Sequence, residues 1–173
     1  MEVQREQYLT FFIRGEEYAA GILRVKEIIE YETVTRVPTT PPHVRGVINL
    51  RGAVLPVIDL AAKFGNGESA ATRTTCIVVV ETRLAGEVLV VGLMADAVSE
   101  VVDIASEAIE APPAFGTNIS TDFLIGMGKL DNRLVLVLDI DRVLSPVELQ
   151  QTIDAVDGGA AGSQPAEITQ TAG

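Results

Sequence analysis

The sequence contains one hairpin pattern twice, and this repeat limits the possible folds more than any other feature. The window from Arg45 to Leu60 matches the window from Ile125 to Ile140 when it is shifted by 80 positions without gaps. Four of the sixteen pairs are identical, and most of the others keep size and apolarity. A period of this length is too long for a solenoid, so it predicts two structurally similar half-domains.

A second, earlier window supports the same interpretation. GEEYAAGIL, which starts at Gly15, matches GEVLVVGLM, which starts at Gly86, with an offset of 71. The two windows occur in the same order, and their offsets differ by about one loop. Chance similarity between apolar strands is the alternative, but two windows that agree in order and nearly in spacing favour an internal duplication.

The composition favours short β-strands joined by tight turns. The chain has no Trp and only eight aromatic residues, whereas Val, Ile, Leu, Ala and Gly are abundant. Its 173 residues, 47% of them hydrophobic, are enough to bury a core. Because hairpin patterns outnumber helical ones, we expect a mainly β protein with short helices, built from two small antiparallel barrels.

Alternating and helical spacings place the expected elements. A short helix is expected over 22–30, because Ile22, Val25 and Ile28 fall at helical spacing. Ser145 can cap a terminal helix over 145–156. The strands are expected over 8–14, 18–22, 34–37, 75–82, 87–94 and 97–104, with a turn at 15–17 and hairpins over 43–60 and 122–140.

These elements suggest one folded unit over residues 1–157 and a disordered tail over 158–173. The unit divides into two barrel subdomains, interleaved or adjacent, over about 8–65 and 73–144. Pro56, inside the first repeated hairpin, is expected at a sheet edge or at a bulge because it lacks an amide donor.

The charge argues against a nucleic-acid partner. The formal net charge is −11, and the sequence has no cluster of Lys and Arg to bind phosphates. Residues 1–65 are balanced, with eight basic and eight acidic side chains, so the excess lies entirely in the second part. Solubility is the simpler explanation of this uneven charge. The alternative is that the two halves present different electrostatic faces to different partners.

The sequence indicates a cytoplasmic protein without membrane insertion. The first twelve residues lack a basic region followed by an apolar core, and no apolar run reaches the roughly 18 residues of a membrane span. The single cysteine, Cys76, lies in the strand-like TTCIVVV, which predicts a buried, inert thiol.

No pattern in the sequence predicts catalysis or a cofactor. The only histidine, His43, follows two prolines in an expected loop, so neither a hydrolytic triad nor a zinc site can be assembled. Neither GNGES nor GMGK has the spacing and context of a phosphate-binding loop. Asp59 and Asp139 occupy matching repeat positions before short helical stretches, and we expect them to cap helices rather than to act as a catalytic pair. We therefore expect no metal, no cofactor and no enzymatic activity.

Several separated motifs resemble one family. These motifs are YLTFFIRGEEYAAGILRVKEIIEY, VTRVPTTPPHVRGVINLRGAVLPVIDL, GLMADAVSEV, IEAPP and IGMGKLDNRLVLVLDI. Together they are similar to the bacterial chemotaxis coupling proteins of the CheW family, in family order, from about Tyr8 to Leu144. Family members often have Arg where this chain has Ala61, and Lys63 is the nearest basic residue.

The resemblance implies a fold and a function. It implies two SH3-like five-stranded antiparallel β-barrels, and a non-enzymatic adaptor of chemotaxis signalling. In this family one molecule couples the cytoplasmic tips of chemoreceptors to the regulatory domain of the histidine kinase CheA. Such proteins help to build receptor arrays on the inner face of the membrane. Barrel ends offer strand and loop surfaces suited to this role.

The resemblance also implies which residues face the receptor. They are Val25, Glu27, Ile28, Leu50, Arg51, Val101 and Val102. Alternatively, Val25 and Ile28 form the core face of the expected helix. Arg51 is then a solvated turn residue or one partner of an internal ion pair. Gly46, Gly52 and Gly126 are expected to be structural turn glycines, with close backbone packing at Gly46 and Gly126. Kinase-binding residues are not assigned.

A second functional hypothesis does not depend on the resemblance. The chain could be a stand-alone regulatory domain that binds a small ligand between its two barrels. A rise in melting temperature on adding the ligand, without receptor or kinase association, would distinguish this possibility from an adaptor.

Overall fold

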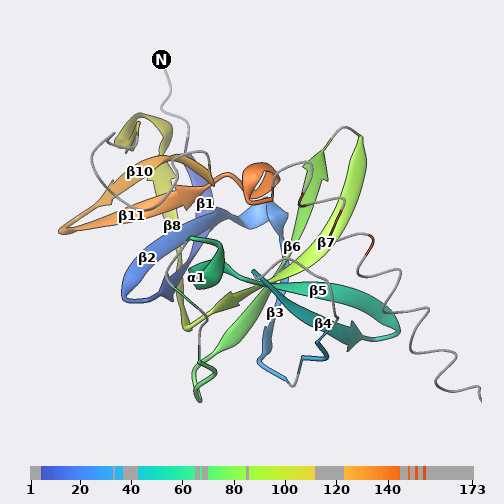
Figure 1. Ribbon diagram of the computed structural model, residues 1–173. Coiled ribbons are helices and arrows are strands. Elements are labelled where there is room, and N and C mark those ends of the chain that lie inside the picture. Colours follow the sequence, from blue (N-terminus) through green and yellow to red (C-terminus); the bar gives the residue numbers. More distant parts are fainter. Residues whose placement is uncertain are drawn as a thin grey trace, which may run out of the picture.

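The computed structural model describes residues 5–32, 34–36, 43–64, 67, 70–84, 86–111, 123–144, 148, 151 and 154. Nearly all of the regular structure is β (Figure 1). The elements are β1 (Arg5–Ile13), β2 (Glu16–Gly21), η1 (Ile22–Arg24), β3 (Val25–Glu30), β4 (Val44–Leu50), β5 (Ala53–Asp59), α1 (Leu60–Lys63), β6 (Cys76–Leu84), β7 (Glu87–Ala95), β8 (Ala97–Ala105), η2 (Ser106–Ala108), β9 (Ile109–Glu110), β10 (Leu124–Leu130), β11 (Arg133–Leu138) and η4 (Ile140–Arg142).

The strands form two sheets, as the sequence predicts for a mainly β protein. One sheet has six strands in the order β8-β1-β2-β11-β10-β9, and the other has five in the order β3-β6-β7-β5-β4. Figure 1 shows the two sheets side by side, with α1 near their junction. The predicted hairpins over 43–60 and 122–140 are present as β4–β5 and β10–β11, both antiparallel.

The sheets do not follow the two halves of the sequence. β1 and β2, from the first half, pair with β8 and β11, from the second. β6 and β7, from the second half, pair with β3 and β5, from the first. Each repeat therefore gives its first hairpin to the sheet completed by the other repeat. The subdomains are interleaved, and a division at residues 65–73 does not separate the sheets.

The predicted helix over 22–30 is wrong. Only Ile22–Arg24 is helical, as the single 3₁₀ turn η1, and Val25–Glu30 is the strand β3. Burial along β3 alternates with period two, and its backbone pairs with β6 through Ile28 with Val78 and Ile29 with Ile77. The helical spacing of Ile22, Val25 and Ile28 was misleading because pairing with a distant strand decides the local conformation.

The two repeated glycines allow another chain segment to approach closely. A Cβ at Gly46 would come closer than 3.0 Å to the backbone of Thr35, and a Cβ at Gly126 equally close to the backbone of Glu110. Both glycines follow a shift of register in their hairpin. They lie inside strands rather than in turns, which corrects the turn assignment and supports the close packing. Gly52 is in a turn, with φ of 89°.

The predicted aspartate caps are present. The Asp59 carboxylate accepts hydrogen bonds from the amides of Ala61 and Ala62, at 3.1 and 3.3 Å, and begins α1. Asp139 accepts from the Asp141 amide at 3.2 Å and begins η4. Both side chains satisfy first-turn amides that have no partner within their helix.

Apolar side chains from both sheets share the largest core cluster. Tyr18 stacks between Phe11 and Phe64, with ring centroids 6.4 and 5.4 Å away. Ala61 is fully buried in the same cluster, so the family's frequent Arg could not occupy this position without rearrangement. Lys63 instead forms an ion pair with Glu148, and its ammonium lies 4.8 Å from the centre of the Phe123 ring.

Other predicted elements are confirmed in part or fall outside the description. The first turn is at Arg14–Gly15, and Glu16 already belongs to β2. Of the strand expected over 34–37, the structure has a bridge between Thr35 and Val47. The edge or bulge position predicted for Pro56 is wrong, because Pro56 lies in the inner strand β5 and pairs with Val47 outside the register shift. Its missing amide is tolerated at the position before the pairing of β5 with β7 begins at Val57. The terminal helix over 145–156 lies largely, and the tail over 158–173 entirely, outside the described residues.

Candidate functional site

The tip of the β4–β5 hairpin is joined to β3 by an ion pair. The Arg51 guanidinium donates a hydrogen bond to the Glu27 carboxylate, across 24 positions of sequence. Arg51 has φ of 51°, and the Gly52 amide donates to the Asn49 side chain at 3.0 Å, which closes the tight turn. The turn thus fixes the backbone from which Arg51 projects.

Arg51 is held but not buried. Its side chain is 70% exposed, and that of Glu27 is 31% exposed. The hydrogen bond with Glu27 raises the pKa of the Arg51 guanidinium further above its usual value, so the charge is permanent. Exposed ion pairs contribute little to stability because water solvates both partners well. This pair is therefore available for an interaction with another molecule at low cost to the fold.

Apolar side chains expected to face the receptor lie on β3, which carries Glu27, and at the end of β4, next to Arg51. Ile28, on the outer face of the edge strand β3, is 43% exposed. Val25 is half-buried against the main core cluster, and Leu50 is half-buried against the core of the five-stranded sheet. Five of the seven expected receptor-facing residues thus lie on β3 or at the β4–β5 tip. The three on β3 were expected on a helix and lie instead on a strand.

The other two expected residues lie on the other sheet. Val101 and Val102 are on β8, an edge strand of the six-stranded sheet, where they pair with Leu9 and Tyr8. Val101 is 50% exposed, whereas Val102 packs against the cluster that contains Tyr8. Six of the seven residues therefore lie on edge strands of two different sheets, and Arg51 lies in the β4–β5 turn.

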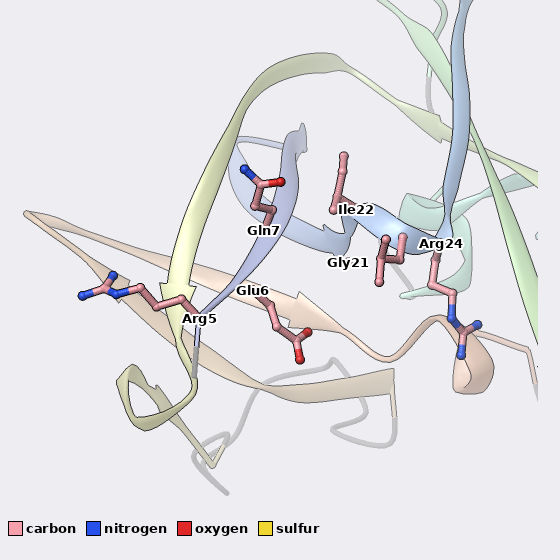
Figure 2. A pocket seen from close by; sticks show the side chains of 7 residues that line it. Arg5, Glu6, Gln7, Gly21, Ile22 and Arg24 are labelled. Atoms are coloured by element: carbon pink, nitrogen blue, oxygen red, sulfur yellow. The ribbon is translucent and has the colours of Figure 1, made fainter. Parts of the chain in front are cut away.

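The structure also shows a polar junction that the sequence did not suggest. The Arg24 guanidinium makes two 2.6 Å hydrogen bonds to Asp141, and the Arg83 amide donates to the same carboxylate at 2.7 Å. These bonds lower the pKa of Asp141. Figure 2 shows Arg24 pointing away from Ile22 toward the segment that carries η4. No local sequence pattern predicts the Arg24–Asp141 interaction, because 117 positions separate the two residues.

A hollow of about 490 Å³ lies beside this junction, at the start of β1 and along η1 (Figure 2). Its walls include Glu6, Gln7 and Ile22. The neighbouring Leu23 is 96% exposed, the highest value among the exposed large apolar residues of the described chain. Periodicity alone does not distinguish Leu23, because its exposure results from the 3₁₀ turn.

The residues with potential chemistry are not arranged for catalysis. His43 is buried, and burial lowers its pKa; its Nε2 lies 3.7 Å from Glu148. Cys76 is only partly buried and not buried as predicted, and this partial burial raises its pKa, which disfavours a reactive thiolate. Across the described ranges, no three His, Cys, Asp or Glu side chains could together hold a metal ion. No helix among these residues is long and apolar enough to cross a membrane.

The two interleaved sheets form an SH3-like fold, with a charged hairpin tip and exposed apolar side chains on its edge strands. Comparison with known proteins specifies the family, because residues 7–148 match the model of the CheW-like domain. The chain belongs to this family.

Individual relatives agree. The chemotaxis protein CheW of Klebsiella aerogenes is 36% identical over 148 residues, which cover 86% of this chain and 87% of the relative. That of Bacillus subtilis is 34% identical and covers 86% and 92%. The crystal structure of the scaffolding protein TtCheW from Thermoanaerobacter tengcongensis superposes with a TM-score of 0.74 at 32% identity, covering 85% of this chain and 92% of that one. The chain is accordingly a chemotaxis scaffold protein and not an enzyme.

Proposed function

We propose that this protein couples chemoreceptors to the histidine kinase CheA and so helps to build receptor arrays. In this proposal it works in the cytoplasm, at arrays on the inner face of the membrane, and binds the regulatory domain of the kinase. Membership of the family supports a role as a scaffold in chemotaxis. The proposal adds the identity of the two partners.

The single observation that carries the proposal is the exposed Arg51–Glu27 pair. A permanently charged guanidinium on a rigid turn presents planar hydrogen-bond donors in a fixed direction. The fold gains little from this pair, because both side chains remain in contact with water. Recognition of an acidic or amide group on a receptor would explain this arrangement, which a contribution to stability does not explain.

We assign the receptor-facing surface to the expected residues in their observed places. Arg51 and Glu27 supply direction, while exposed Ile28 supplies apolar area to a receptor helical hairpin. Val101 on β8 offers a second exposed apolar position on the other sheet. The half-buried members, which contribute mainly by shaping the strands, are Val25, Leu50 and Val102.

The repeat supplies a matched control for the test. Asp131 occupies the position of Arg51 in the β10–β11 hairpin, and its φ of 43° is similar to the 51° of Arg51. We therefore compare Arg51→Ala with Asp131→Ala, measuring association with a receptor cytoplasmic fragment and with CheA by pull-down. We expect Arg51→Ala to weaken receptor association by about tenfold, and Asp131→Ala to leave it unchanged.

The melting temperatures of both variants should equal that of the wild type, which separates binding from folding. Equal receptor association in the wild type and Arg51→Ala would contradict the surface assignment. Failure of the wild-type protein to associate with receptor or kinase would contradict the coupling function. In that case, a melting temperature raised by a small molecule would favour the regulatory ligand-binding domain.

A further inference from the structure

A hollow opens where β2 and β11 diverge. Their parallel register pairs Tyr18 with Leu136 and Ala19 with Val137, and Figure 1 shows the strands separating toward the β1–β2 turn. A cavity of about 470 Å³ lies in this opening. Its apolar wall comes from three strands, with Phe12 on β1, Met127 on β10, and Leu134 and Leu136 on β11.

One carboxylate in this cavity is buried and incompletely paired. The Glu17 side chain is 6% exposed, and its Oε1 accepts a 2.8 Å hydrogen bond from Nε of Arg133. Its Oε2 is buried without a hydrogen-bond partner among the described residues. A buried acceptor without a donor is costly, because the water it lost has not been replaced. The described residues therefore leave one oxygen of a carboxylate that lines the hollow without a donor.

The other half of the molecule shows that the fold does not need this carboxylate. The offset of 71 that aligns the two first hairpins places Val88 at the position that corresponds to Glu17. Ala53 corresponds to Arg133 by the offset of 80. The other half therefore carries apolar residues at the two positions that correspond to the Glu17–Arg133 ion pair.

The charge around the hollow favours a cation. Glu16 is exposed at its rim, and Arg133 also pairs with Glu100 at 2.7 Å. Three carboxylates (Glu16, Glu17 and Glu100) and one guanidinium leave a formal charge of −2. The apolar wall beside them suits a methylene chain, so a long basic side chain matches both parts of the cavity.

We propose that this hollow is a docking site for an Arg or Lys side chain that projects from a partner protein. Its charged head donates to Oε2 of Glu17 and approaches Glu16, while its stem lies on Leu134 and Leu136. The inference goes beyond the coupling function, since none of these residues belongs to the proposed receptor-facing surface. A failure here would leave the test at Arg51 unaffected.

The first experiment uses butylguanidinium as the probe and butylurea as its neutral counterpart. Titrations of the full chain are followed by amide chemical shifts in NMR. Butylguanidinium is expected to shift amides near Glu16, Glu17 and Leu134, and butylurea is not. Glu17→Gln should weaken probe binding by about tenfold, because the amide keeps the shape and removes the charge.

Two further variants keep the result interpretable. Glu16→Gln changes an exposed residue, so a loss of probe binding in this variant cannot come from unfolding. Glu87→Gln is the matched control, because the exposed Glu87 begins β7 as Glu16 begins β2. Equal probe binding in the wild type and in both Glu16→Gln and Glu17→Gln, or no probe binding at all, would overturn the proposal.

The second experiment tests whether the cation belongs to a protein. Affinities for CheA and for a receptor cytoplasmic fragment are measured separately with wild type, Glu16→Gln and Glu87→Gln. A salt-sensitive loss of about threefold or more for one partner, in Glu16→Gln alone, supports the docking site and identifies the partner. Butylguanidinium binding without any change toward either partner would overturn the assignment to a protein side chain.

Discussion

The two repeated hairpins share a backbone but differ at their tips and at the helices that follow. Gly46 and Gly126 serve the same close approach, and both second strands end in a capping aspartate. At the tips, however, Arg51 binds Glu27, whereas the counterpart Asp131 is an exposed acid. The difference indicates that the duplication is retained where the backbone must pack and is lost where the surface can specialise.

The shared glycines should have the largest effect on stability. Gly46→Ala and Gly126→Ala each introduce a Cβ that overlaps backbone atoms, which cannot move aside as a flexible side chain does. We expect each to lower the free energy of unfolding by about 3 kcal/mol. Gly46→Ala should cost more, since φ of 148° at Gly46 also favours glycine.

Urea denaturation followed by circular dichroism measures this effect. Gly21→Ala is the control, because no atom lies within 4 Å of the Cβ it would add. A loss below about 1 kcal/mol at either repeated glycine would show that the close approach is not required at that hairpin.

The capping aspartates should rank next and should be unequal. Asp59 is 1% exposed, caps two amides and lies 3.5 Å from Arg45, whereas the partly exposed Asp139 caps one amide. We expect Asp59→Ala to cost about 2 kcal/mol and Asp139→Ala about 1 kcal/mol in urea denaturation. Equal losses in the two variants would mean that neither the burial of Asp59 nor its second capped amide adds stability.

The Arg24–Asp141 junction has no counterpart in the first repeat, where Ala61 stands at the matching position. The hydrogen bonds from Arg24 lower the pKa of Asp141 from its ordinary 3.8. The stabilisation is therefore complete at neutral pH. It is lost as pH falls below 3.8 and through the lowered pKa of the folded state.

Arg24→Gln tests this asymmetry. Because both side chains are about one-third exposed, we expect a loss of only about 1 kcal/mol at neutral pH. The gap between wild type and variant should narrow in urea titrations at successive pH values below 3.8. A gap that stays constant with pH would show that Arg24 acts through packing and not through its charge.

The tips should have the smallest effect on stability and a large one on binding. The reversals Glu27→Arg and Arg51→Glu should leave the unfolding transition unchanged, because the pair is exposed. We expect receptor association to fall in each single variant and to remain low in the double variant, which re-forms the ion pair with the wrong polarity. Full recovery of receptor association in the double variant, measured by pull-down, would show that the ion pair only positions the hairpin tip.

Local patterns were informative where neighbours along the chain decide the structure. The hairpin turns, the capping aspartates and the repeat itself depend on residues a few positions apart. The strand β3 failed this rule, since Val25 and Ile28 follow a helical spacing but pair with β6 about 50 positions later. In the candidate site, Glu27 and Arg51 could be named from motifs, but their ion pair could not.

The amino-acid sequence alone indicates a mainly β protein with a duplicated hairpin, and several separated motifs carry its family resemblance. Alternation, turn residues and caps act over short distances, so they can be read directly from the letters. The completion of each repeat's sheet by the other repeat becomes visible only in the folded molecule. The same is true of the contact between Arg133 and Glu17 across 116 positions, and of the buried Glu17 oxygen without a partner among the described residues. These features depend on which strands meet, and that choice follows from the packing of the whole chain.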